Sequence, residues 1–159
     1  MENLSYADED YNLWLLLLKV RRAIFKARER ELSKYGITPE QVGVLYIVQS
    51  NGKKITPAEI SRLTLREPHT VSGLIDRMTK AGLVRKVKDL SRKNLVKFSM
   101  TKKGRQAYIQ STKRESIQDV LSCLSKKERQ QLRLYLEKLQ DKAIEVLEAN
   151  HKLPFSKSR

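Results

Sequence analysis

The sequence predicts a mainly α-helical fold with one small β-hairpin. Three observations lead to this fold class. The same helix N-capping pattern recurs at several points along the chain. Apolar residues repeat at helical spacing after these caps, and residues 83–100 show the alternation typical of strands. At 159 residues the chain is about one domain long, so we expect a core that needs neither disulfides nor metals.

Three of the helix starts are capping boxes, in which a hydroxyl residue is followed three positions later by Glu or Gln. They are Thr38-Pro39-Glu40-Gln41, Thr56-Pro57-Ala58-Glu59 and Ser125-Lys126-Lys127-Glu128. Each pair of side chains can satisfy backbone amides that lack a partner in the first turn. Thr101 is a fourth N-cap, although Gly104 then occupies the third helical position and costs helix propensity.

From these starts we expect six helices, followed by a polar tail at residues 150–159. The helices are Asp8–Ser33, Pro39–Ser50, Pro57–Leu63, Pro68–Ala81, Lys102–Leu121 and Lys126–Ala149. Gly36 and Gly82 follow the first and fourth helices, where left-handed C-caps are expected.

The segment LVRKVKDLSRKNLVKFSM predicts the hairpin, with the polar residues 89–94 as its turn. One face of the first strand holds Leu83, Arg85 and Val87, and one face of the second holds Val96, Phe98 and Met100. Nine cations in and just after this segment accompany a single acid, Asp89. They are Arg85, Lys86, Lys88, Arg92, Lys93, Lys97, Lys102, Lys103 and Arg105. Such a ribbon repels itself unless an anion lies against it.

The whole chain is strongly basic. Its formal net charge is +15 and its sequence pI is about 10.0. This charge favours a polyanionic partner, with nucleic acid first and an anionic membrane surface second, over a basic surface without function. The single cysteine, Cys123, favours a reducing compartment, and the longest apolar run, Leu13–Leu18, is too short to cross a membrane. We therefore expect a soluble cytoplasmic protein.

Residues for metal, cofactor or catalytic chemistry are scarce. The histidines are His69 and His151, and neither lies near Cys123 in the sequence, so no zinc spacing exists. The six glycines include no G-x-G arrangement, which excludes the usual phosphate-binding fingerprints. We expect no metal, no cofactor and no enzymatic activity.

The segment TPAEISRLTLREPHTVSGLIDRMTKAGLV predicts two short helices joined by a tight turn over Thr64–Glu67. In the second helix one apolar stripe forms at i, i+3, i+4 and i+7, and the opposite face is polar. The major groove of B-DNA admits one such helix, with residues near its N-terminus reaching the bases. Thr70 and Ser72 can donate to bases or phosphates, Gly73 allows close approach, and Arg77 and Lys80 can hold phosphates.

His69 has two interpretations, a surface histidine or a donor at the tip of a groove-reading helix. With the turn and the hairpin included, the candidate DNA-binding residues are Arg66, Pro68, His69, Thr70, Ser72, Gly73, Arg77, Lys80, Arg85, Arg92, Lys93 and Asn94.

The order of these elements, with GLV leading into the hairpin and MTKKG after it, resembles the multiple-antibiotic-resistance regulator (MarR) family of winged-helix transcription factors. The resemblance covers residues 11–147, with the helix-turn-helix at 57–80, the wing at 83–100 and dimerisation helices at 8–33 and 102–149. It implies a homodimer, with the helix from Pro68 in the major groove and the wing's tip in an adjacent minor groove. In the stretch DLSRKN, Asp89 and Arg92 stand further apart than is usual for the family, so either Arg92 or Lys93 enters the minor groove.

The first and last helices each carry a largely apolar face at helical spacing. These faces are Tyr11, Trp14, Leu15, Leu18, Arg22 and Phe25 in the first, and Leu132, Leu136, Leu139, Ala143 and Val146 in the last. Either the two helices pack on each other within one chain, or they interleave with a second copy, as the resemblance implies. A two-fold dimer predicts a pseudo-palindromic operator.

The resemblance also implies a cleft for a small aromatic or phenolic effector that weakens DNA binding. Trp14, Tyr46 and Tyr108 either line such a cleft or belong to the core. Some family members sense oxidants through a cysteine in the first helix, whereas Cys123 lies near the end of the fifth, so we expect it to be a small buried hydrophobe.

The function favoured by the sequence is a homodimeric, sequence-specific DNA-binding transcriptional regulator, expected to be a repressor. One alternative is a non-specific architectural DNA-binding protein, whose affinity would not depend on the duplex sequence. Another is a protein-interaction module for an acidic partner, which would not be retained on duplex DNA at moderate salt.

Overall fold

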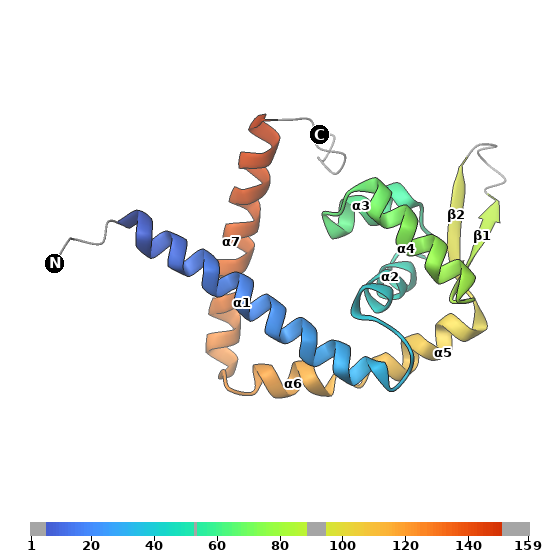
Figure 1. Ribbon diagram of the computed structural model, residues 1–159, viewed down its shortest axis with the longest axis horizontal. Coiled ribbons are helices and arrows are strands. Elements are labelled where there is room, and N and C mark those ends of the chain that lie inside the picture. The colour runs from blue at the N-terminus through green and yellow to red at the C-terminus, as the bar shows by residue number, and fades with distance from the viewer. Residues whose placement is uncertain (1–5, 53, 89–94, 151–159) are drawn as a thin grey trace.

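A computed structural model describes residues 6–52, 54–88 and 95–150 of the chain. The helices are α1 (Tyr6–Ser33), α2 (Pro39–Ser50), α3 (Pro57–Thr64), α4 (Pro68–Lys80), α5 (Lys102–Ser111), α6 (Glu115–Leu121) and α7 (Lys126–Asn150), and the strands are β1 (Val84–Lys88) and β2 (Val96–Met100). In Figure 1, α3, α4 and the hairpin gather at one end, while α7 and the first half of α1 lie at the other. The mainly helical fold class with a small hairpin is confirmed.

The core lies between α2, α3, α4 and the hairpin. Its fully buried side chains include Leu45 of α2, Ile60 of α3, and Ile75 and Met78 of α4, and Phe98 of β2 is only 5% exposed. The end of α1 joins this core through Leu32. This packing holds the two helices of the predicted helix-turn-helix against the hairpin.

The predicted capping chemistry is confirmed at all four positions. Thr38 and Thr56 both form complete capping boxes, and Glu128 and Ser125 exchange hydrogen bonds at 2.7 and 3.2 Å. The hydroxyl of Thr101 accepts a hydrogen bond from the amide of Gly104 at 3.0 Å. These caps are decided by residues three positions apart, which is why the sequence alone predicts them.

Gly104 brings α5 into direct contact with the backbone that enters the hairpin. A Cβ atom at this position would lie 2.0 Å from the carbonyl oxygen of Leu83, which is closer than any side chain can be. The hydroxyl of Thr101 also donates to the carbonyl of Gly82, whose φ of +71° is left-handed. The propensity cost of glycine in the first turn is therefore offset by close packing, and the predicted left-handed cap at Gly82 is confirmed.

The single helix predicted over Lys102–Leu121 is wrong, because the chain breaks between α5 and α6. Arg114 has a left-handed φ of +54°, and side chains of α1 satisfy the backbone at the break. Arg28 donates to the carbonyl of Ser111 at the end of α5, and Glu31 accepts hydrogen bonds from the amides of Glu115 and Ser116 at the start of α6. These distant partners stabilise two helix ends that local sequence does not mark.

The hairpin is confirmed, with β1 and β2 antiparallel and Val84 opposite Met100. Residues 89–94, the predicted turn, lie outside the described residues. Ile55, just before α3, adds a short third partner by exchanging backbone hydrogen bonds with Phe98 at 3.0 and 2.7 Å. The core side of the hairpin is formed by Phe98 with Val84, whereas Arg85 on the alternate face is exposed.

The outer helices leave apolar side chains exposed. Tyr11 and Trp14 of α1 are 58% and 49% exposed, and Leu136 and Leu139 of α7 are 46% and 49% exposed. The chain therefore does not cover these faces itself, as the alternative of packing within one chain would require. Within the described part of the chain, no helix has the length and apolar character to span a membrane.

Candidate nucleic-acid interface

Helix α4 is divided into a buried stripe and a polar outer face. Val71, Leu74, Ile75 and Met78 are between 0% and 5% exposed and anchor the helix in the core. The side chains of Pro68, His69, Thr70, Ser72, Asp76, Arg77 and Lys80 are exposed, and Gly73 is half-buried. The predicted stripe is confirmed, and the remaining side chains of the anchored helix face the solvent.

The turn between α3 and α4 is held by a buried serine. The hydroxyl of Ser61, which is 2% exposed, donates to the carbonyl of Arg66, while the amide of Arg66 donates to the carbonyl of Ser61 at 3.1 Å. Leu65 adopts a left-handed φ of +52°, which turns the chain sharply between the helices. This arrangement fixes the angle at which α4 leaves the core, and it places the half-buried Arg66 just ahead of α4.

The first turn of α4 differs from those of α2, α3 and α5. Its N-cap, Glu67, makes no side-chain hydrogen bond to the helix, and Pro68 occupies the first helical position. The amides of the first turn therefore remain available, and helix N-termini favour anions such as phosphate. This end of α4 also carries the exposed donors Thr70 and Ser72.

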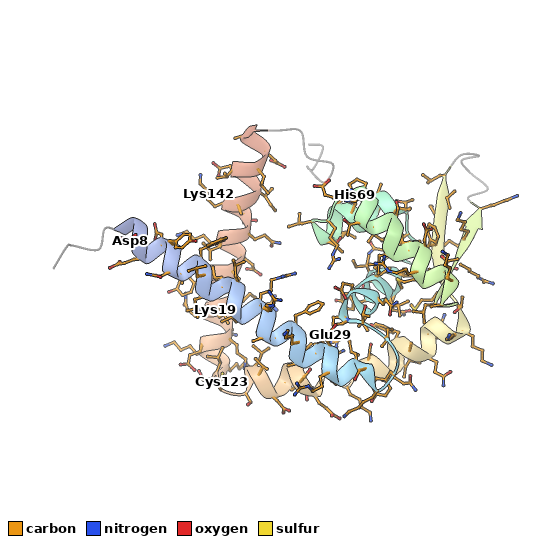
Figure 2. All side chains as sticks on the ribbon, in the orientation of Figure 1. Asp8, Lys19, Glu29, His69, Cys123 and Lys142 are labelled. Carbon is orange, nitrogen blue, oxygen red and sulfur yellow. The ribbon has the colours of Figure 1, made fainter. Side chains whose placement is uncertain are left out.

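The start of α4 and the open end of the hairpin lie on the same side of the molecule. Figure 1 shows the end of β1 and the beginning of β2 pointing away from α5 and α6. Figure 2 places His69 on that same side, remote from Cys123, which follows α6. One extended partner can therefore meet both elements.

The cations of the hairpin are divided between its two faces. Arg85 lies opposite Ser99, whereas Lys86 and Lys88 lie opposite Phe98 and Val96 on the alternate face. All three cations are exposed. Lys86 and Lys88 share the face of the hairpin that carries Phe98, and they are not among the contacts predicted from the sequence. The predicted contacts Arg92, Lys93 and Asn94 lie outside the described residues.

One protein-family model matches part of the chain. The model of the MarR family matches residues 35–93, a segment that contains α2, α3, α4 and β1. Over this segment the chain is similar to the MarR family. Helices α3 and α4 lie at the positions predicted for the helix-turn-helix, and the hairpin of β1 and β2 lies at the position predicted for the wing.

Solved structures share the MarR-family fold over most of the chain. The organohalide-sensing transcriptional regulator RdhR-CbdbA1625, in its 2,4-dichlorophenol-bound form, is 26% identical with a TM-score of 0.82, covering 97% of this chain and 89% of the other. A cysteine-to-serine mutant of MarR from E. coli, complexed with operator DNA, is 22% identical with a TM-score of 0.77, covering 83% and 96%. MepR from S. aureus, in a DNA complex, is 22% identical with a TM-score of 0.71, covering 90% and 99%. No curated protein matches the chain.

Trp14, Tyr46 and Tyr108, for which a cleft or a place in the core is expected from the sequence, are not among the residues that line the groove described below. Trp14 and Tyr46 are 49% and 52% exposed, and Tyr108 packs against the core. A groove does lie between α1 and α2, and it is lined by Leu18, Lys19, Arg21, Arg22, Phe25, Lys26, Glu29 and Glu40. Phe25 and Leu18 supply apolar surface and Arg22 supplies a cation.

The expectation that Cys123 is a buried hydrophobe is wrong, because its side chain is exposed in the chain. Its thiol lies 3.2 Å from the carbonyl of Val120, near the end of α6. The prediction follows the general tendency of free cysteines to be buried. The break before α6 instead gives a helix of seven residues with none of them buried.

Proposed function

We propose that this protein is a homodimeric transcriptional regulator of the MarR type, which binds a specific operator in double-stranded DNA and acts as a repressor. The observation that carries the proposal is the outer face of α4, which is polar and exposed while the opposite face is fully anchored in the core. A recognition helix must hold its position while its outer side chains contact base edges. The outer face of α4 meets both requirements.

The residues of α4 divide by chemistry into two roles. Thr70 and Ser72 lie near the N-terminus, where hydroxyl groups reach base edges in the major groove. Arg77 and Lys80 lie further along the helix and hold phosphates, which position the protein without reading sequence. Asp76 is exposed between them and forms no ion pair with another described residue, so it favours a position away from the phosphates.

The wing supplies further cations beside this helix. Arg85, Lys86 and Lys88 are exposed on β1, and the sequence adds Arg92 and Lys93 at the turn. An arginine is favoured in a narrow minor groove because the negative potential there is enhanced. The DNA complexes among the structural neighbours support this use of the fold, since both contain proteins of the same architecture.

The exposed apolar faces of α1 and α7 support a homodimer. A helix of 28 residues is about 42 Å long, and much of α1 extends past the lobe formed by α2 to α5. Apolar groups on this scale are normally covered by a partner. A second copy presents the same faces with two-fold symmetry, and it places two α4 helices roughly 34 Å apart on one side of the duplex.

We further propose that a small phenolic effector relieves repression from the groove between α1 and α2. The groove combines the apolar Leu18 and Phe25 with the cationic Arg22. The structural neighbour bound to 2,4-dichlorophenol supports this class of ligand. A ligand that wedges between α1 and α2 changes the angle between the dimerising helices and the DNA-binding lobe.

The competing function is non-specific architectural binding, which the net charge of +15 also favours. Selection of bound duplexes from a random pool distinguishes the two. The proposal predicts enrichment of a two-fold symmetric motif whose half-sites are about 10 base pairs apart. A pool that stays random after several rounds, although duplexes are retained, means architectural binding. If the protein retains no duplex at all, the result favours the protein-interaction module for an acidic partner.

A further inference from the structure

A shallow pocket on the outer face of the wing gathers three cations from three separate elements. Lys54 lies just before α3, Arg85 lies on β1 and Arg105 lies on α5. The remaining lining is Val87, Ser99 and Met100. None of these residues belongs to α4 or to its outer face.

The strand register explains why these residues meet. Ile55 exchanges backbone hydrogen bonds with Phe98, so Lys54 lies across from Ser99, and Ser99 lies across from Arg85 on β1. Adjacent residues of a strand point to opposite faces. Lys54, Ser99 and Arg85 therefore share the face opposite the buried Phe98, and Arg105 reaches this face from α5.

Ser99 is the unusual member of the pocket. Its hydroxyl oxygen is shielded from solvent and has no hydrogen-bond partner among the described residues. Leaving a buried hydroxyl unpaired costs free energy, so such a group points to a partner that the protein itself does not supply. A hydroxyl can donate to an anionic oxygen, and the three neighbouring cations make an anion the favoured partner.

The charges at this pocket are not balanced by acids. Neither Lys54, Arg85 nor Arg105 forms an ion pair with another residue in the described ranges, and all three side chains are exposed. Converging like charges are unfavourable unless an anion lies between them. Arginine also offers paired donors that match the geometry of a phosphate.

We propose that this outer wing pocket binds an oxyanion of phosphate chemistry, with Ser99 donating to one oxygen and Arg85, Arg105 and Lys54 neutralising the charge. The phosphate has two possible sources. One is a free phosphate-type anion, which does not depend on the proposed function. The other is a phosphodiester of bound duplex, which rests on the proposed DNA binding and would extend the footprint from α4 to the far side of the wing.

The first arm of the test uses inorganic phosphate and no DNA. The thermal unfolding midpoint of the full chain is measured at constant ionic strength while phosphate replaces chloride. Binding predicts a saturable rise of roughly 3 °C once phosphate exceeds its dissociation constant about tenfold. The double substitution Arg85→Gln with Arg105→Gln abolishes the rise, and Lys34→Gln with Lys113→Gln, which removes the same charge elsewhere, keeps it.

Ser99→Ala separates a ligand contact from a purely structural role. Removing an unpaired buried hydroxyl leaves the protein without phosphate as stable as before or slightly more stable. The same substitution reduces the phosphate-induced rise. If Ser99→Ala instead lowers the midpoint without phosphate and leaves the rise unchanged, the hydroxyl has a structural role and the proposal is overturned.

The second arm measures the salt dependence of duplex binding for the same variants. If the pocket takes a DNA phosphate, the wing double variant lowers the slope of log K against log salt by about 0.9 relative to the charge-matched control. A phosphate-dependent rise without a change of slope identifies a free anion as the ligand. If the wing variant and its control agree in both arms, the pocket binds no oxyanion, whatever the outcome for operator binding by α4.

Discussion

The carboxylate of Glu31, near the end of α1, caps the first turn of α6 through Ser116. It accepts a hydrogen bond from the amide of Ser116 at 3.2 Å and another from the hydroxyl of the same residue, while Arg28 lies 2.7 Å away. Burial alone would raise the pKa of this carboxyl. The hydrogen bonds from Ser116 and Arg28 outweigh burial and lower the pKa of Glu31 from 4.5 to about 2.

This low pKa predicts a dependence of stability on acid. Because the pKa of Glu31 is depressed in the folded state, its contribution is complete above pH 4.5 and is lost as the pH falls from there towards 2. Glu31→Gln should lower the free energy of unfolding at pH 7 by roughly 3 kcal/mol and flatten its fall between pH 5 and 2. Urea denaturation at fixed protein concentration measures both effects. Glu29→Gln, on an exposed position of α1, is the control, and an equal decrease in stability in the two variants would contradict the capping role.

Gly104→Ala should destabilise the protein strongly. The new Cβ atom would overlap the carbonyl oxygen of Leu83 at 2.0 Å, so α5 must shift away from the hairpin, at a cost of roughly 2 kcal/mol or more. Gly43→Ala in α2 is the matched control, since no neighbouring atom lies within 4 Å of its Cβ position, and it should raise stability by about 0.5–1 kcal/mol. Thermal or urea unfolding measures the stability of both variants. Similar effects at both positions would mean that the position of α5 does not depend on the close contact between Gly104 and Leu83.

The two groups of α4 residues should affect DNA binding differently. Thr70→Val and Ser72→Ala should relax base preference, because they remove donors that read base edges. Arg77→Ala and Lys80→Ala should weaken binding to all duplexes and lower the salt slope by about 0.9 for each phosphate that is no longer neutralised. Anisotropy titrations with matched and altered duplexes measure both quantities. The double substitution Arg92→Ala with Lys93→Ala should likewise weaken binding to all duplexes and lower the salt slope. An unchanged affinity would mean that these two residues do not contact DNA.

Replacing a leucine of α7 by an acid should separate the proposed dimer. Leu136 is 46% exposed in the single chain and lines an open groove between α6 and α7, so Leu136→Asp should yield a folded monomer in analytical ultracentrifugation. Gln131→Asp adds the same charge to an exposed α7 position outside that groove and should remain a dimer. A dimeric Leu136→Asp variant would place the interface on another face of the helix.

The sequence predicts the local features of this fold well. The capping boxes at Thr38, Thr56 and Ser125 depend on residues three positions apart, and the apolar stripe of α4 depends on helical spacing, so both are predicted correctly. Most helix boundaries agree to within two residues for the same reason. The polar face of α4 follows from the stripe, so its residues can be chosen as candidates from helical periodicity alone.

The sequence does not reveal features that depend on distant partners. The break between α5 and α6 is stabilised by Arg28 and Glu31, more than 80 residues earlier, and no local signal marks it. The wing pocket needs the strand register that sets Lys54 and Arg85 on either side of Ser99. The apolar character of cysteine alone predicts a buried Cys123. The structure instead leaves Cys123 exposed, beside a helix α6 in which no residue is buried by the rest of the chain.

The most direct test of the proposed function is fluorescence anisotropy of the protein with its own upstream DNA and with a scrambled duplex, each across a salt series. Both affinities should fall as salt rises, because cations of α4 and the wing displace counterions from phosphates. A site-specific regulator predicts that the upstream duplex binds roughly a thousandfold more tightly than the scrambled one at physiological salt. Superimposable curves for the two duplexes, together with a random pool that yields no symmetric motif, would contradict operator recognition by α4.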